Sequence, residues 1–271
     1  MHDDSFALLA LLFLIVGACY ASVGHAGASG YLAVMAVMGV DAAAMRPVAL
    51  LVNVVVATIA SAQFAAAGHA SIRFLLPFAL ASVPAAFVGG WIVLPVRALS
   101  MAIGAILLLT AARMAWVALR SGRRAAGRGG APHPAAAGDP ELRESEKPRE
   151  VSPAARAVAG GAIGFVAGLT GTGGGIFLSP LLLVFGWALP HRVAATAALF
   201  ILANSLAGLG GILARGWTPP TGLWLLAAAA AVGGTLGSTY GSRRATPKAL
   251  NLILAAVLVV AGAKLIARAG G

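Results

Sequence analysis

Two glycine-rich segments interrupt long apolar runs, and both carry residues that can bind a ligand. GHAGASG covers residues 24–30, and GTGGG covers residues 171–175. Glycine allows a ligand to approach the backbone closely. A helix that starts after such a break directs unpaired N–H groups and its positive dipole end toward the break. We expect helices to begin near Ser29 and near Ile176, an arrangement that favours binding of an anion.

The candidate substrate-binding residues are the glycines of the two breaks, the polar side chains beside them and two amides within long apolar runs. They are Gly24, His25, Gly27, Ser29, Asn53, Thr170, Gly171, Thr172, Gly173, Gly174, Gly175 and Asn204. His25 could contact the substrate, carry a proton, or be a satisfied buried histidine. The two asparagines could line the cavity or join helices by hydrogen bonds.

Several kinds of chemistry are excluded by residues that the sequence lacks. No carboxylate occurs from 42 to 138 or from 151 to 271, so neither break has an acid nearby to repel an anion or to hold a metal. The single cysteine, Cys19, cannot form an internal disulfide. No Gly-Lys-Ser/Thr follows GTGGG, as a nucleotide-binding loop would require. We therefore expect neither an enzyme nor a resident cofactor or metal.

The composition predicts a polytopic helical membrane protein. Apolar residues make up 60% of the 271 residues and charged residues only 10%, and the mean hydropathy is +0.92. A soluble domain has about 45–50% apolar and about 25% charged residues. The apolar runs lie at 5–23, 29–40, 47–67, 74–94, 98–119, 157–170, 175–189, 193–214, 221–241 and 249–267.

The order of these runs indicates an internal duplication, with a first repeat at 1–119, a flexible linker at 120–153 and a second repeat at 154–271. With an offset of 147 residues, four glycines of the first repeat fall on four of the second: Gly17, Gly24, Gly27 and Gly39 on Gly164, Gly171, Gly174 and Gly186. The runs 29–40 and 157–170 are too short to cross a bilayer. Each repeat is therefore interpreted as a broken-helix hairpin, with its tip inside the protein, followed by three transmembrane helices.

The distribution of basic residues predicts the orientation. With the linker in the cytoplasm, most Lys and Arg lie inside, and only Arg46, Arg97, Arg215 and Arg268 are clearly outside. Both termini are then outside, and the two repeats are inverted, as in many secondary transporters. The net charge of +11 is explained by these topogenic residues, so no nucleic-acid partner is expected. Glycines spaced by four at 160, 164 and 168, and at 233, 237 and 241, predict helix-packing faces.

The segments GHAGASGYLAVMAVMGV and GFVAGLTGTGGGIFLSPLLLVFGW resemble the TauE/SafE (TSUP) sulfite exporter family. The second segment carries the stronger match, at Gly164, Gly168, Gly171, Gly173, Gly174, Gly175, Pro180 and the stretch 192–196. The first segment departs from the pattern at His25, Ala26 and Ala28. The resemblance implies transport of small sulfur-containing anions such as sulfite, sulfonates (for example sulfoacetate) or thiosulfate. Members with a thiosulfate-relay mechanism depend on several cysteines, and this chain has one.

Together these observations predict an exporter in a bacterial inner membrane that works by alternating access. An inside-negative potential favours exit of an anion by about 2.3 kcal/mol per charge per 100 mV, so export needs no coupling carboxylate. An anion channel and an importer of a sulfur oxyanion remain as alternatives, and a membrane-embedded enzyme or a non-transporting subunit is disfavoured. The expected partners are a small anion and the lipid bilayer, and the oligomeric state stays open.

Overall fold

The computed structural model of the chain describes residues 3–21, 25–66, 68, 70–127, 151–220, 222–241, 255, 258–260, 262–267 and 269. Every regular element in these ranges is a helix, as predicted. The helices are α1 (Asp3–Ala21), α2 (Ala28–Val37), α3 (Ala42–Ala66), α4 (Ile72–Trp91), α5 (Val96–Gly127), α7 (Pro153–Thr170), α8 (Gly175–Val184), α9 (Pro190–Leu213) and α10 (Leu223–Gly241). A further apolar helix, Leu258–Ala267, is described in part.

Five helices in the described part of the chain are long and apolar enough to cross a membrane, which confirms a multi-pass helical protein. They are Ala42–Ala66, Ile72–Trp91, Val96–Arg113, Pro153–Thr170 and Arg192–Leu213. The helix α2 has 10 residues and is therefore about 15 Å long, half of the hydrocarbon core. This confirms the short run that the sequence predicts in the first repeat.

The short helix of the second repeat is α8, with 10 residues, and not the run 157–170. That run belongs to α7, which has 18 residues because Pro153 opens the helix and the Ser152 hydroxyl caps it. The Ser152 Oγ accepts a hydrogen bond of 3.2 Å from the Ala155 N–H. A turn at Gly186, which has φ +66°, follows the end of α8. Each half of the chain, 3–127 and 151–241, thus begins with a long helix followed by one of ten residues.

The helix α5 continues through Gly127 and so enters the segment that the sequence assigns to the linker. Residues 120–127 are RSGRRAAG, in which alanine and arginine are good helix formers. The rest of that segment, up to residue 150, lies outside the described residues.

Two glycine faces bring helices from the two halves of the chain into close contact. A Cβ atom at Gly160, Gly164 or Gly168 of α7 would overlap the backbone of α4. A Cβ atom at Gly233 or Gly237 of α10 would overlap the backbone of α1. These contacts confirm the predicted packing faces at these five positions, because only glycine permits such an approach.

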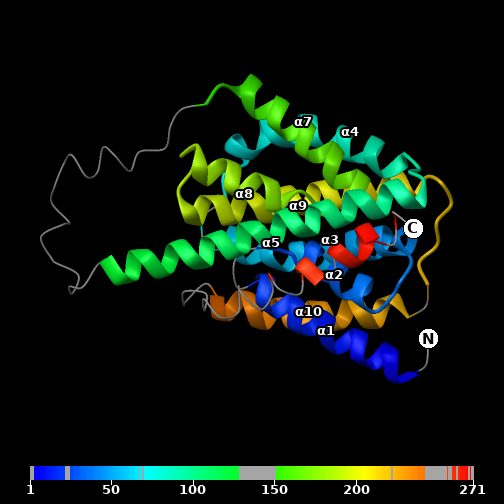
Figure 1. Cartoon of the computed structure of the whole chain (residues 1–271). Helices are drawn as coiled ribbons and strands as arrows, with labels where there is room; N and C mark the ends of the chain where they lie inside the picture. The colour runs from blue at the N-terminus through cyan, green and yellow to red at the C-terminus, as the bar shows by residue number, and fades with distance from the viewer. Residues whose placement is uncertain are drawn as a thin grey trace, which may run out of the picture.

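The helix contacts of the first half of the chain (α1 to α5) correspond to those of the second half (α7 to α10). The first helix of each half packs on the fourth of the other, as α1 on α10 and α7 on α4. The central helices α3 and α9 pack on each other, and α4 contacts α9 as α10 contacts α3. In Figure 1, α4 and α7 lie along the top, α1 and α10 along the bottom, and α3 and α9 between them. Both glycine-rich breaks lie inside this bundle.

Candidate functional site

The first break lies between the end of α1 at Ala21 and the start of α2 at Ala28, one residue from the predicted start. Gly27 precedes α2 with φ +93°, a conformation that glycine adopts most readily. In α2, Tyr31 is the first residue whose N–H has a backbone acceptor, the Gly27 carbonyl at 3.0 Å. The predicted site residue Gly24 lies outside the described residues.

The second break runs from Gly171 to Gly174, and α8 begins at Gly175. Gly171, Gly173 and Gly174 all have positive φ, at +83°, +69° and +83°. In α8, Phe177 is the first residue whose N–H has a backbone acceptor, the Gly174 carbonyl at 3.1 Å. The N–H groups of residues 172–176 therefore have no protein acceptor within the described part of the chain.

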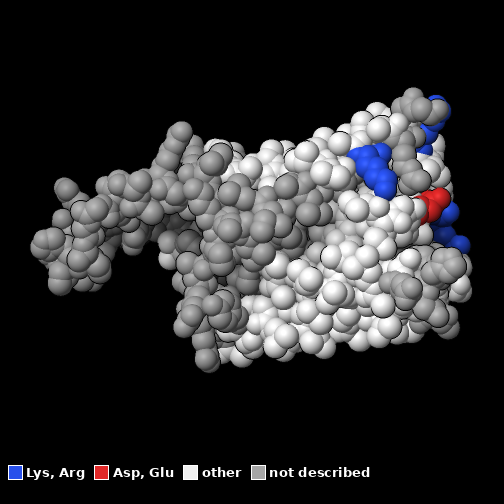
Figure 2. Space-filling view, turned by 60° about the horizontal axis from the view of Figure 1, so that its bottom comes forward, with Lys and Arg blue, Asp and Glu red and all other residues white. Residues whose placement is uncertain are grey.

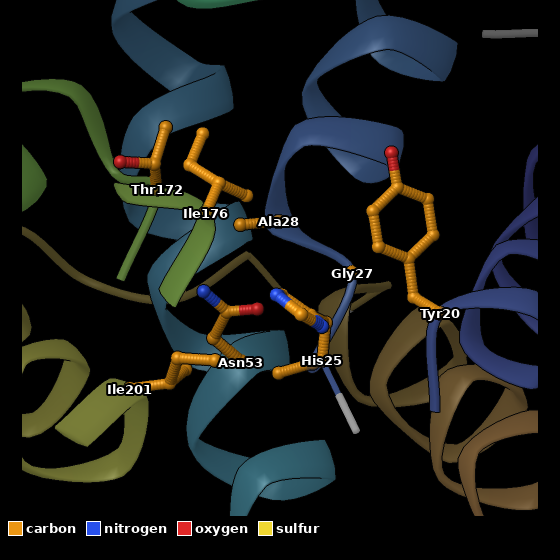
Figure 3. Close-up of a pocket in the computed structure, with 9 residues that line it drawn as sticks. Tyr20, His25, Gly27, Ala28, Asn53, Thr172, Ile176 and Ile201 are labelled. Carbon is orange, nitrogen blue, oxygen red and sulfur yellow. The ribbon is translucent and has the colours of Figure 1, made fainter. Parts of the chain in front are cut away.

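The two breaks meet in the interior and enclose a small pocket. The imidazole Nε2 of His25, from the first break, is hydrogen-bonded to the Ser179 hydroxyl of α8 at 3.1 Å. The pocket is lined by Tyr20, His25, Ala26, Gly27, Ala28, Asn53, Thr172, Ile176 and Ile201. Figure 3 shows the His25 ring and the Asn53 carboxamide side by side, with Tyr20 beyond the Gly27 backbone. The pocket therefore takes residues from both halves of the chain.

Buried polar atoms without partners surround the backbone of Gly173. Both amide atoms of Asn53 and the hydroxyl of Ser205 are buried and have no hydrogen-bond partner among the described residues. A Cβ atom on Gly173 would lie 2.7 Å from the Asn53 Nδ2 and 2.9 Å from the Ser205 Oγ. Leaving such a group unpaired costs about 1–3 kcal/mol, so native proteins seldom do so without a reason. Amide N–H and hydroxyl groups can all donate to an anion.

The other predicted site residues lie around the pocket rather than on its wall. The Ser29 hydroxyl donates to the Tyr20 hydroxyl at 3.0 Å. The Thr170 hydroxyl donates to the Val166 carbonyl at 2.7 Å and lies 3.2 Å from that of Thr172. These bonds orient Tyr20 and Thr172, both of which line the pocket.

Asn204 and three of the glycines have different surroundings. The Asn204 Nδ2 donates to the Phe200 carbonyl one turn earlier at 2.9 Å, whereas its Oδ1 is buried without a partner in the described residues. A Cβ atom on Gly171 would meet the backbone of Arg46 at 2.9 Å, and one on Gly174 would meet Phe200. A Cβ atom on Gly175 would meet Ile201 and would lie 3.7 Å from the His25 ring. The first two glycines therefore serve packing, whereas Gly175 packs against Ile201 near the His25 ring, and both of these residues line the pocket.

Sequence reasoning missed Ser179 and Ser205. Ser179 is four residues after Gly175, on the same helix face, and it could have been found from that spacing. Ser205 follows Asn204 directly, and nothing in its spacing distinguishes it from a packing residue. Asn53 and Asn204 are themselves 151 residues apart. This is also the offset that matches Arg97-Ala98-Leu99 with Lys248-Ala249-Leu250 near the ends of the repeats.

The pocket is closed in this conformation. The space that the centre of a water-sized molecule can occupy is about 10 Å³, which is about enough for one water. Asn53 and Thr172 are buried, and His25 is only 9% exposed. Any polyatomic ligand is larger than one water, so its entry would require the residues around the pocket to move.

The chain is similar to a family of membrane transporters over almost its whole length. A model of the sulfite exporter TauE/SafE family matches residues 9–265. A probable membrane transporter protein, y4hK, of Sinorhizobium fredii is 39% identical over 260 residues, which cover 95% of this chain and 97% of that protein. Two probable membrane transporter proteins of Xylella fastidiosa strains are 42% and 40% identical over 84 residues, 31% of each chain. No solved structure matches the chain.

Proposed function

Because this chain belongs to the TauE/SafE sulfite exporter family, whose members are membrane transporters and not enzymes, we propose that it exports a small sulfur-containing anion. The substrate class comprises sulfite and sulfonates such as sulfoacetate. The anion binds between the two breaks, where its oxygens accept hydrogen bonds from the N–H groups after Gly171, from Asn53 and from Ser205. Bonds to a charged acceptor are about twice as strong as neutral ones. The observation that carries this proposal is the convergence of unpaired donors on Gly173.

The transport mechanism that we propose is alternating access by two inverted repeats. The matching helix pairs support this proposal, since α1 packs on α10 as α7 packs on α4. The hydrogen bond between His25 and Ser179 joins the two hairpins and would have to break or re-form as the repeats rock. Binding of the substrate at the meeting point of two repeats is a common feature of secondary transporters.

The closed pocket favours a carrier over the alternative of an anion channel. A conducting channel needs a continuous water-filled path, whereas the space beside Asn53 holds about one water. For direction, we propose export, since the inside-negative potential drives an anion outward. An importer would need a co-transported cation, and His25 is the candidate proton carrier for it.

For orientation, we propose that the linker is cytoplasmic and that both ends of the chain are outside the inner membrane. In Figure 1 the blue start of α1 and the red last helix of the chain lie toward the same end of the molecule, which supports a common side for the two ends. The excess of basic residues near the linker supports the cytoplasmic side for that segment.

Thermal unfolding of the purified protein in detergent tests the proposed substrate class. The protein is heated with sulfite, sulfoacetate, taurine, thiosulfate, sulfate or chloride. A ligand at 100 times its Kd stabilises the folded state by about 2.7 kcal/mol, which raises Tm measurably. We expect sulfite or sulfoacetate to raise Tm and chloride to have no effect. Equal shifts with all six, or no shift with any, would contradict the proposal. Counterflow of the stabilising anion in liposomes then separates a carrier from a channel.

A further inference from the structure

A second and larger cavity lies at the end of the bundle where α3 begins and α9 ends. The space open to water-sized molecules in it is about 300 Å³. Arg46 of α3, and Arg215 and Trp217 of the α9–α10 loop, line it together with apolar side chains. In Figure 1 this loop runs at the end that carries the N and C marks, and in Figure 2 the visible basic atoms gather at the same end, with acidic atoms beside them.

Arg46 is held rigidly on the wall of this cavity. It is only 5% exposed, and its guanidinium donates to the last carbonyls of α4. One Nη donates to Ile92 at 3.0 Å, and the other donates to Gly89 at 2.7 Å and to Gly90. The Nε atom is buried and has no partner among the described residues. Capping the carbonyl end of α4 fixes the position of this cation.

The positive charge of the cavity is not neutralised by any carboxylate partner in the described residues. Neither Arg46 nor Arg215 forms an ion pair there. The acid closest in sequence, Asp41, accepts a hydrogen bond of 2.7 Å from the Ala43 N–H and so caps the start of α3. Two cations in a concave, partly apolar site focus the field and concentrate anions. The planar guanidinium also matches the geometry of an oxyanion.

The cavity is close to the central pocket. Arg46 and Asn53 are seven residues apart on α3, or about 10 Å along the helix axis. Gly171 of the second break packs on the backbone of Arg46. A ligand in the cavity would therefore lie about two helical turns from the unpaired donors of the central pocket.

We propose that this cavity is a second anion-binding site, which holds a small oxyanion at the mouth of the transport path. The sulfur-oxyanion identity of its natural ligand rests on the proposed function, whereas binding of a small oxyanion as such rests only on the two arginines and the cavity. Trp217 forms one wall, so an anion in the site contacts an indole that reports on it.

Quenching of Trp217 by iodide tests the site in the full-length protein. Phenylalanine replaces Trp91, Trp116, Trp187 and Trp224, which leaves Trp217 as the only tryptophan. A matched protein keeps Trp91 alone, on an exposed position at the end of α4. The measured quantity is the ratio of quenching by iodide to quenching by the neutral quencher acrylamide. We expect this ratio to be higher for Trp217 than for Trp91. We also expect sulfate to compete with iodide at Trp217 only.

Arg215→Gln provides the decisive comparison, because Arg215 is exposed and its replacement leaves the bonds of Arg46 intact. We expect R215Q to lower iodide quenching of Trp217 about twofold or more, with acrylamide quenching unchanged. Arg97→Gln is the control: Arg97 is also exposed, near the start of α5, and does not line the cavity. Iodide quenching that R215Q leaves unchanged, or that R97Q lowers equally, would overturn the proposal.

A variant of the central pocket separates this proposal from the proposed function. Asn53→Leu should leave iodide quenching of Trp217 unchanged, even where it abolishes the sulfite-dependent rise in Tm. In the protein with all its tryptophans, R215Q should raise the KM of counterflow and retain the rate at saturating substrate. If the thermal screen fails while sulfate still competes with iodide, the second site stands and the proposed substrate does not.

Discussion

At the scale of single residues, the Asn53 carboxamide is buried in an apolar bundle with neither of its polar atoms paired in the described residues. An unpaired buried amide destabilises the protein without a bound ligand. Its presence is consistent with a ligand that supplies the missing hydrogen bonds. The Ser205 hydroxyl, like Asn53, lies beside the backbone of Gly173, and it is also buried without a partner in the described residues. Donors that are left unpaired in this way are prepared for an acceptor that the protein does not supply.

Asn53→Leu should stabilise the unliganded protein and weaken anion binding. Removing an unpaired buried amide recovers about 1–3 kcal/mol, less any strain from the branched side chain. Loss of one charge-assisted hydrogen bond should weaken binding about tenfold or more. Ser61→Ala is the matched control, because Ser61 is buried and unpaired on the same helix but does not line the pocket. Unfolding with and without sulfite measures both effects, and equal affinity for wild type and N53L would remove Asn53 from the site.

Gly173→Val should abolish anion binding in a protein that still folds. Its Cβ would lie 2.7 Å from the Asn53 Nδ2, and φ is +69°, so the side chain fills the place of the ligand. The backbone strain alone costs about 1–2 kcal/mol. Gly186→Val carries a similar strain at φ +66°, with nothing within 4 Å, and should bind normally. Binding of sulfite by both variants, or by neither, would show that strain and not the site governs the result.

His25→Gln should retain anion binding better than His25→Leu. The imidazole Nε2 is hydrogen-bonded to the Ser179 hydroxyl at 3.1 Å and joins the two breaks. Glutamine can keep a hydrogen bond to Ser179, whereas leucine cannot. Thermal unfolding with increasing sulfite measures the affinity of each variant, and equal affinities would show that this hydrogen bond plays no part in binding.

At the scale of helices, the glycine clusters predict the two breaks well, because glycine combines conformational freedom with poor helix propensity. Both inner helices begin one residue before the predicted positions. Hydropathy does not predict the start of α7 or the end of α5, because both lie in polar sequence. In such sequence, capping residues and helix propensity determine where a helix begins and ends. It also cannot pair His25 with Ser179, since they are 154 residues apart and meet only through the packing of two hairpins.

Gly164→Ala should destabilise the protein, whereas Gly161→Ala should not. A Cβ atom at Gly164 would overlap the Ser82 backbone of α4, but one at Gly161 meets the Ala81 Cβ at 3.6 Å, an ordinary contact. Alanine is a better helix former than glycine by about 1 kcal/mol, so G161A should raise Tm slightly. Equal Tm values for the two variants would argue against close packing of α4 on α7.

At the scale of the whole molecule, residues 3–127 and 151–241 do not form two separate bodies. The first helix of each segment packs on a helix of the other, as α1 on α10 and α7 on α4, while α3 and α9 form the centre. The duplication stays a prediction from matched glycines and run order. The exchange of helices could not be predicted, because hydropathy carries no information on which apolar helices are neighbours. The central pocket depends on this exchange, since its residues come from both halves of the chain.

Labelling of single introduced cysteines should show that the linker and the α9–α10 loop lie on opposite sides of the membrane. With Cys19→Ser as background, Ala136→Cys in the linker should react with an impermeant maleimide only after the membrane is opened. Thr218→Cys, which follows Trp217 in an exposed loop, should react in intact cells. This follows from the excess of basic residues near the linker. Labelling of both from the same side would contradict the proposed topology.

The interlocked first helices also constrain how the protein is made. The ribosome delivers α1 first, yet α10, whose glycine face packs on it, emerges near the end of synthesis. The newly inserted α1 must therefore face lipid or an insertion factor through most of translation. Release of a chain truncated before α10 would leave that surface uncovered in the bilayer, where quality-control proteases act on unassembled helices.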